Sequence, residues 1–264
     1  HEPVFLQIVE FLRFSLGTRY NYKTMTTSSS NIMEIIRRNL LDIQQRMQAA
    51  VERSEFCMNS PKLIAVTKYA ESEWIEALVE LGCRNFGESR PQQLAQRKVW
   101  LAEVKDLRWH QIGHLQRNKV RPVVEAGAWI HSIDSWRLLD RIEEISAELQ
   151  LTTPLLLQIN ISGEEQKSGF APEDFLEEVE RIKSLNHCRV LGLMTMAPDT
   201  EDENIIRNVF RELRILRDQA RQKLPAELQL PELSMGMSGD FEIAIEEGAT
   251  MVRVGSKLYR GLTS

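Results

Sequence analysis

The sequence contains few cysteines, and their arrangement argues against two kinds of site. Its three cysteines, Cys57, Cys83 and Cys188, lie far apart, and none belongs to a CxxC pair or to a Cys/His pattern with metal-ligand spacing. We therefore expect neither a disulfide framework nor a metal site. Scattered cysteines of this kind are typical of a reducing compartment, so we expect a cytoplasmic protein.

Long apolar runs and an excess of positive charge are also missing. No stretch reaches the ~18 uninterrupted apolar residues of a membrane span, so we expect no membrane partner. The net charge is −5, from 33 basic and 38 acidic side chains. Because proteins gain affinity for nucleic acids mainly by neutralising phosphates, we expect no nucleic-acid partner. An anionic ligand would have to be held by a local group of donors.

The first 30 residues differ from the rest of the chain. Their apolar segment, residues 3–16, is interrupted by charged side chains, which spoils the pattern of a secretory signal peptide. The chain begins with histidine, and Met25 is followed by a run of threonine and serine. We expect residues 1–30 to be an extension that is disordered or an artefact, and residues 31–264 to be one domain.

From Asn31 onward the pattern is regular. Asn31 and Glu34 have the spacing of a capping box, and apolar residues then recur at helical spacing, which predicts a leading helix over 31–56. Short apolar runs then alternate with segments of helical period. The predicted strands are 63–67, 84–86, 107–112, 128–133, 154–160, 189–194, 232–235 and 251–254. The predicted helices are 71–81, 91–101, 116–125, 135–149, a segment that begins at Pro172, 203–223 and 241–247.

Eight strands that alternate with helices favour an α/β protein, a single (β/α)8 TIM barrel over about residues 62–261, preceded by the leading helix. The alternative is an open doubly wound sheet. Such sheets usually have fewer strands, and the glycine fingerprint of a dinucleotide site is absent. No linker rich in proline, glycine or serine divides the chain. Because the outer helices offer no distinct oligomer seam, we expect a monomer.

The loops after the seventh and eighth predicted strands are candidates for a phosphate site. Barrel enzymes have their sites at the carboxyl ends of the strands, and these two loops frequently bind phosphate. The first loop contains Ser238 and Gly239 just before a helix, and the second contains Gly255 and Ser256. Free backbone N–H groups in such loops can bind an anion. Either pair alone could be an ordinary tight turn, but the two together favour phosphate.

Two cations are expected at the same end of the barrel. Lys68 directly follows the first apolar run, where partial desolvation would make its amine nucleophilic and suited to Schiff-base chemistry. Arg253 lies between Val252 and Val254, so alternation along the strand predicts that its guanidinium points into the barrel. A lysine, a phosphate cup and an inward arginine are the parts of a pyridoxal 5'-phosphate (PLP) site.

Seven ordered segments make the sequence similar to the pyridoxal phosphate homeostasis protein family over about residues 60–261. Each segment alone is a weak signal, whereas all of them together at compatible spacing are highly specific. The segments are 65–68, 85–88, 109–119, 160–161 with 167–169, 192–196, 235–240 and 252–256.

The resemblance implies a relative of the alanine racemase barrel, the type III PLP fold without its second β domain. It implies that Lys68 holds PLP as a Schiff base, that the two loops bind its phosphate, and that Arg253 meets the pyridine nitrogen. The expected cofactor-binding residues are Lys68, Ser89, Met235, Ser238, Gly239, Arg253, Gly255 and Ser256.

The sequence departs from the family pattern at two places. Many members have asparagine where this chain has Ser89, and many have lysine and proline where Tyr69 and Ala70 follow Lys68. The first departure puts the contact of residue 89 with the cofactor ring in question. The neighbouring Glu88 either orients the Ser89 loop or is simply solvated.

Other candidate residues have competing interpretations. His110 and His114 could be acid/base groups, but no carboxylate pattern lies near them, and we expect structural roles. Lys167 could accept the cofactor transiently during transfer, or could be a plain surface lysine. Met194 and Met196 are expected to be core residues or part of the cofactor wall. We assign no catalytic residue.

Three functions compete. The first is a carrier that holds PLP on Lys68, delivers it to the apo forms of PLP-dependent enzymes and balances vitamin B6 and amino-acid pools. The second is an amino-acid racemase that uses the same lysine. Racemisation needs a base on each face of the aldimine. We expect the second base to be missing, because the chain ends too soon after the eighth strand for the added β domain that supplies it. An arginine at the ring nitrogen also makes the cofactor a weaker electron sink. The third is a regulatory protein that senses PLP. We expect the first, without robust catalysis.

Overall fold

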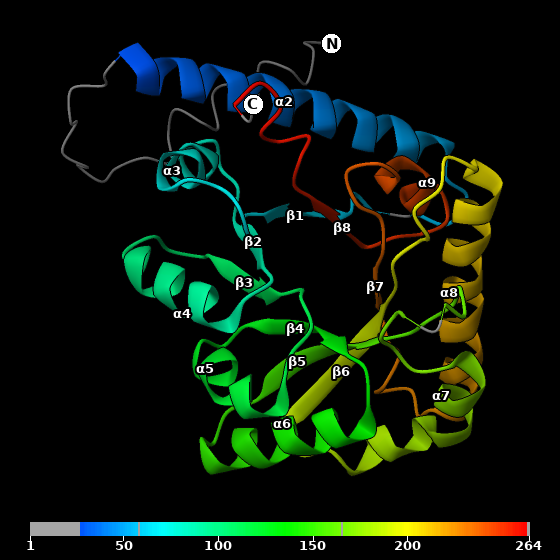
Figure 1. Ribbon diagram of the computed structural model, residues 1–264. Coiled ribbons are helices and arrows are strands. Elements are labelled where there is room, and N and C mark those ends of the chain that lie inside the picture. The colour runs from blue at the N-terminus through cyan, green and yellow to red at the C-terminus, as the bar shows by residue number, and fades with distance from the viewer. Residues whose placement is uncertain (1–26, 58, 165, 263–264) are drawn as a thin grey trace, which may run out of the picture.

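Eight parallel strands form a closed barrel in the computed structural model, which describes residues 27–57, 59–164 and 166–262 (Figure 1). Each strand pairs with the next in sequence, and β8 closes the barrel against β1. The predicted (β/α)8 barrel is therefore confirmed, and the open doubly wound sheet is excluded. The strands are β1 Lys62–Val66, β2 Asn85–Glu88, β3 Arg108–Gln111, β4 Trp129–Ile133, β5 Thr153–Gln158, β6 Cys188–Met194, β7 Glu232–Ser234 and β8 Met251–Val254.

Helices surround the barrel in the order that the sequence predicts. None of those in the described ranges is long and apolar enough to cross a membrane. The α-helices are α2 Thr27–Arg53, α3 Ser72–Glu80, α4 Pro91–Trp100, α5 Val120–Glu125, α6 Trp136–Glu148, α7 Pro172–Glu178, α8 Glu203–Lys223 and α9 Phe241–Glu246. Short 3-10 helices, η1 Arg117–Lys119 and η2 Val179–Ser184, precede α5 and follow α7.

The leading helix is longer at its start than the sequence predicts. It begins at Thr27 and ends at Arg53, so Asn31 lies inside it and the capping box with Glu34 does not mark its first turn. The threonine and serine residues before Asn31 continue the helix because each costs only a few tenths of a kcal/mol in helical conformation. The expectation for residues 1–30 falls, for residues 1–26, outside the described part of the chain.

Helix α2 completes the outer ring of helices. It packs between α9, which follows β7, and α3, which follows β1, while β8 is followed by a turn rather than an α-helix (Figure 1). The side chain of Asn39 donates to the carbonyl oxygens of Leu258 and Arg260, at 3.0 and 2.9 Å, and so ties this turn to α2. The buried face of α2 recurs at helical spacing and consists of Ile36, Leu40, Ile43, Met47 and Ala50.

The barrel interior has an apolar layer and a polar layer. Ile64, Leu156, Met194 and Met251 pack together inside the barrel, with Met196 half-buried against them, so both methionines are core or wall residues as expected. Arg253 is two residues beyond Met251 on the same face of β8, nearer the carboxyl end. Its neighbours Val252 and Val254 belong to the cluster between the strands and helices. The predicted inward direction of Arg253 is therefore seen in the structure.

Candidate functional site

Lys68 lies at the carboxyl end of the barrel, two residues after β1. Its side chain is exposed, with Nζ 5.2 Å from the centre of the Tyr69 ring. In the pairing of β1 with β8, Ile64 lies opposite Arg253, and therefore Lys68 and the loop after β8 share one end of the barrel. Burial within the protein therefore does not supply the expected partial desolvation of the Lys68 amine, and a bound ligand would have to supply it.

The loop that carries Lys68 is fixed from outside the strands. Arg97, on α4, donates to the carbonyl oxygens of Thr67 and Ala70 and to the carboxylate of Glu88. The Thr67 hydroxyl donates to the same carboxylate. Glu88 is fully buried, and this burial raises the pKa of its carboxyl group. Glu88 is therefore not solvated. Its carboxylate accepts from Thr67 and Arg97 and so contacts the loop that carries Lys68.

The loops after β7 and β8 form one cradle. The hydroxyl oxygen of Ser238 accepts a hydrogen bond from the backbone N–H of Gly255 at 3.0 Å, which joins the two loops. Within the described residues, the backbone N–H groups of Ser238, Gly239 and Ser256 donate to no protein acceptor. A Cβ added at Gly239 would meet nothing within 4 Å, so the space above the loop is open. Free N–H groups around an open space fit an anion such as phosphate.

Arg253 is a buried cation whose charge has no carboxylate partner within ion-pair distance in the described part of the chain. Its side chain donates from Nη1 to the Ser234 hydroxyl at 2.6 Å and from Nη2 to the Thr195 carbonyl oxygen at 2.9 Å. Burial lowers its pKa to about 10, an effect that the negative charge of Asp240 opposes. A guanidinium has five N–H donors. The remaining donors fit an acceptor on a ligand, such as the pyridine nitrogen of PLP.

Ser89 is half-buried and directly follows β2. Its carbonyl oxygen accepts from the Gln111 side chain at 3.0 Å. A Cβ at Gly113 would come within 2.5 Å of the same oxygen, so the two loops are in close contact. The backbone at Ser89 is thus held by the end of β3, whatever its side chain contacts.

The expected residues do not all meet at one point. Strands β7, β8 and β1 are neighbours, and they bring the Lys68 loop, the cradle and Arg253 to one end of the barrel. The side chain of Met235 is instead fully buried in the hydrophobic cluster outside the strands. Ser234 faces the interior, so its successor faces outward by alternation. Of Met235, only the backbone can contribute to the cradle.

Sequence reasoning named His110 and expected a structural role for it, but missed the buried polar residues to which it is bonded. Inside the barrel, His131 hydrogen-bonds to both His110 and Ser234. Alternation along the fourth strand was the available signal for His131, because Trp129 and His131 share a face. No carboxylate stands near His114 in the sequence. In the structure its side chain is exposed and lies 3.2 Å from the carboxylate of Asp134, which directly follows β4.

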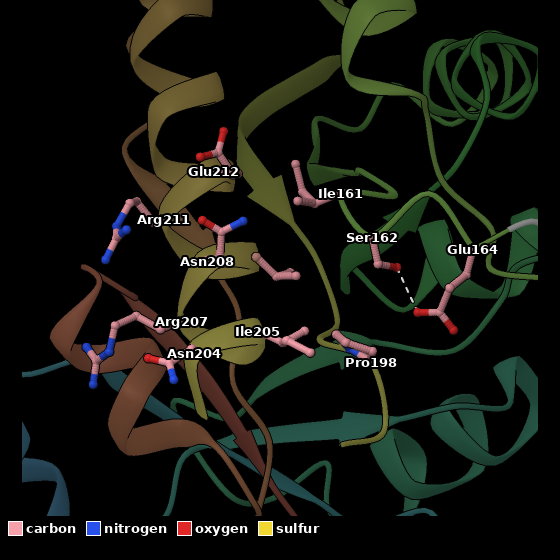
Figure 2. A pocket seen from close by; sticks show the side chains of 11 residues that line it. Ile161, Ser162, Glu164, Pro198, Asn204, Ile205, Arg207, Asn208, Arg211 and Glu212 are labelled. Carbon is pink, nitrogen blue, oxygen red and sulfur yellow. Dashed lines mark hydrogen bonds between the residues drawn. The ribbon is translucent and has the colours of Figure 1, made fainter. Parts of the chain in front are cut away.

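A separate cavity of about 760 Å³ lies beside the barrel end (Figure 2). It is lined by the loop after β5, by Pro198 in the loop after β6, and by the first turns of α8. In Figure 2, Ser162 and Glu164 lie on the side opposite α8, joined by a 2.8 Å hydrogen bond. Lys167 pairs with Glu164 and is not a free surface lysine. None of the expected cofactor residues lines this cavity.

Comparison with known families and relatives gives consistent results. The family model for the N-terminal domain of alanine racemase matches residues 36–263. The pyridoxal phosphate homeostasis protein of Aquifex aeolicus (strain VF5) is 39% identical over 217 residues, which are 82% of this chain and 94% of the relative. That of Synechocystis sp. (PCC 6803) is 39% identical over 200 residues, 76% of this chain and 91% of the relative.

Solved structures agree with these matches. PipY of Synechococcus elongatus PCC7942, solved with PLP bound, has a TM-score of 0.72 and 36% identity, covering 82% of this chain and 99% of PipY. The alanine racemase of Clostridium difficile 630 has a TM-score of 0.68 and 15% identity, covering 86% of this chain and 56% of the racemase. At such low identity the second likeness concerns the fold alone.

Proposed function

Since this chain belongs to the alanine racemase N-terminal domain family and, within it, to the pyridoxal phosphate homeostasis proteins, we propose that it binds PLP and serves in PLP homeostasis. The observation that carries the proposal is the meeting of three features on adjacent strands. They are the Lys68 amine after β1, the open N–H cradle after β7 and β8, and the buried Arg253 without a carboxylate partner. These features suit the aldehyde, phosphate and ring nitrogen of PLP.

Each residue has a separate task in this proposal. Lys68 supplies the amine for a Schiff base, and Arg97 holds the loop on which it stands. The N–H groups of Ser238, Gly239 and Ser256 bind the phosphate, with Gly255 holding the Ser238 hydroxyl in place. PLP itself supplies the reactive aldehyde and a ring that withdraws electrons. Arg253 donates to the ring nitrogen and leaves it unprotonated, because a guanidinium does not give up its proton.

We extend the proposal to delivery of PLP to the apo forms of PLP-dependent enzymes. The exposed position of Lys68 supports this role, because the amine that holds the cofactor can be reached from outside the barrel. Delivery would take place in a reducing, cytoplasmic setting, and the free cysteines Cys57, Cys83 and Cys188 are compatible with it. We propose that the chain acts as a monomer.

Borohydride reduction followed by peptide mapping tests the binding site. The purified protein loaded with PLP should be yellow, and reduction should fix the cofactor on Lys68. Lys68→Ala should lose the colour, whereas Lys167→Ala is the matched control, a half-buried lysine at the same end of the barrel. An adduct mapped to a lysine other than Lys68 would refute the assignment.

A transfer experiment tests delivery. The loaded protein is diluted into buffer and, in parallel, into buffer that contains an apo-enzyme, and the rate at which PLP leaves Lys68 is compared. A faster departure in the presence of the apo-enzyme supports delivery. Identical rates would mean that the protein only releases PLP into solution, and would remove delivery as an active function.

A further inference from the structure

A chain of hydrogen bonds crosses the barrel interior from Arg253 to Asn85. Beyond the Arg253–Ser234 contact, the Ser234 hydroxyl lies 2.9 Å from His131 Nδ1, and His131 Nε2 lies 2.9 Å from His110 Nδ1. His110 Nε2 lies 3.2 Å from the side-chain oxygen of Asn85. The middle residues are 0–1% exposed, and they come from β7, β4 and β3.

The two ends of this chain fix the direction of every bond in it. Arg253 can only donate, so the Ser234 oxygen accepts from it. The Ser234 hydrogen then needs an acceptor, and His131 Nδ1 is the one within reach among the described residues. An unsatisfied buried hydroxyl would cost about 1–3 kcal/mol. Ser234 therefore donates to His131 Nδ1, which leaves the proton of this ring on Nε2.

The direction of the two remaining bonds, from His131 to His110 and from His110 to Asn85, follows from the first. His131 Nε2 donates to His110 Nδ1, so the second ring also carries its proton on Nε2. That proton points to the Asn85 oxygen, which can only accept. Reversal of the chain would place the lone pair of His110 Nε2 against this oxygen. Only when the bonds run from Arg253 to Asn85 does each donor along the chain meet an acceptor.

We infer that Ser234, His131 and His110 are positioning residues: a one-way chain of neutral groups that orients Arg253 toward the ring nitrogen of the cofactor. This inference rests on the proposed function for its ligand. A carboxylate in the place of Ser234 would neutralise Arg253 and compete for its donors. A neutral acceptor orients the guanidinium and leaves its positive charge for the ligand.

The surroundings keep both imidazoles uncharged. Burial lowers the pKa of His110 to about 3, with Lys62 and Arg108 adding to the effect. Burial also holds the pKa of His131 well below its ordinary value, with His110, Arg253 and Lys62 as further causes. The charged groups around the chain are thus mainly cations. Of the carboxylates that face it, Glu232 is paired with Lys62, and the negative charge of Asp240 acts on Arg253.

Nitrogen-15 NMR of histidine-labelled protein without cofactor tests the chain directly. We expect both His110 and His131 to carry the proton on Nε2 and neither to titrate between pH 8 and 5. A proton on Nδ1 of either ring, or an imidazolium at pH 6, would overturn the inference. Because no PLP is present, this result is independent of whether the proposed function holds.

A pair of serine variants tests the effect on Arg253. Ser234→Ala removes the side-chain acceptor of Arg253 Nη1 and leaves the Thr195 carbonyl oxygen as acceptor of Nη2. We expect PLP to be released about tenfold more readily, with the absorbance of the bound cofactor becoming pH-dependent. Ser146→Ala is the control, because Ser146 is equally buried but bonds to Thr153 near the opposite end of the barrel. If wild-type protein binds PLP and Ser234→Ala retains it equally with an unchanged pH profile, the positioning role is wrong. If wild-type protein does not bind PLP, the proposed function fails and the NMR result alone decides the chain.

Discussion

Arg97 pairs with the buried carboxylate of Glu88 on the outer side of the barrel wall, where the side chains of the two residues are 13% and 0% exposed. The same guanidinium donates to the carbonyl oxygens of Thr67 and Ala70, the residues on either side of the Lys68–Tyr69 pair. The Arg97 guanidinium, itself held by Glu88, therefore fixes both ends of the loop that presents the proposed Schiff-base lysine. The exposed amine of Lys68 can move, but its backbone is held.

Loss of Arg97 should destabilise the fold strongly. Arg97→Ala leaves the buried carboxyl group of Glu88 without its partner, and breaking a buried pair in this way costs about 3–5 kcal/mol. Urea unfolding at pH 7 measures the change. The control is Arg121→Ala, which breaks the exposed pair with Glu148 and should cost less than about 1 kcal/mol. Equal effects of the two variants would contradict the special role of Arg97.

The pH dependence of stability should report the buried state of Glu88. Burial raises the pKa of this carboxyl group above its ordinary value of 4.5, so in that range the folded chain binds a proton more readily than the unfolded chain. The free energy of unfolding should then fall as the pH rises through the raised pKa. In Glu88→Gln this contribution is absent. We expect wild-type stability to fall relative to this variant as the pH rises above 4.5, and a relative rise would contradict the assignment.

The fold could be predicted from the sequence because its signals are local and repeated. Strands such as β1, β5 and β6 were marked by a short apolar run, and the helices by a period of 3.6 residues, so the boundaries agree within a few residues. The start of α2 was the exception. A capping box such as Asn31 with Glu34 favours a helix start at its first residue, but it does not prevent the preceding turn from being helical.

The site could be predicted only in part. Arg253 and the loops at Ser238 and Gly255 follow from strand alternation and from the known place of barrel sites. The contacts of Arg97 with Thr67 and Ala70 could not be foreseen, because they depend on how α4 lies against the loop after β1. The buried chain of histidines likewise depends on which strands face one another across the barrel.

Two glycines of the cradle should respond differently to alanine. Gly236 has a φ of +89°, and a Cβ there would lie 2.6 Å from the Cβ of Ala244, so Gly236→Ala should destabilise the fold by about 1–3 kcal/mol. Gly239 has open space, so Gly239→Ala should fold normally. It should nevertheless weaken PLP binding, because the new methyl group occupies the cradle. Thermal unfolding and PLP titration of both variants measure the two effects, and a Gly239→Ala protein that binds PLP normally would show that the phosphate lies elsewhere.

Arg253 should contribute to ligand binding at the expense of stability. Among the described residues, this buried cation donates only to neutral acceptors, Ser234 and Thr195, so no ion pair there offsets its desolvation. Arg253→Met keeps much of the side-chain volume and removes the charge. We expect the cofactor-free variant to be at least as stable as the wild type in urea, while its retention of PLP falls tenfold or more, by roughly the strength of a charge-assisted hydrogen bond. Arg253→Lys should retain PLP better than Arg253→Met, because a positive charge remains. Unchanged retention in Arg253→Met would place this residue away from the ring. A large loss of stability without cofactor would show that Arg253 serves the fold instead.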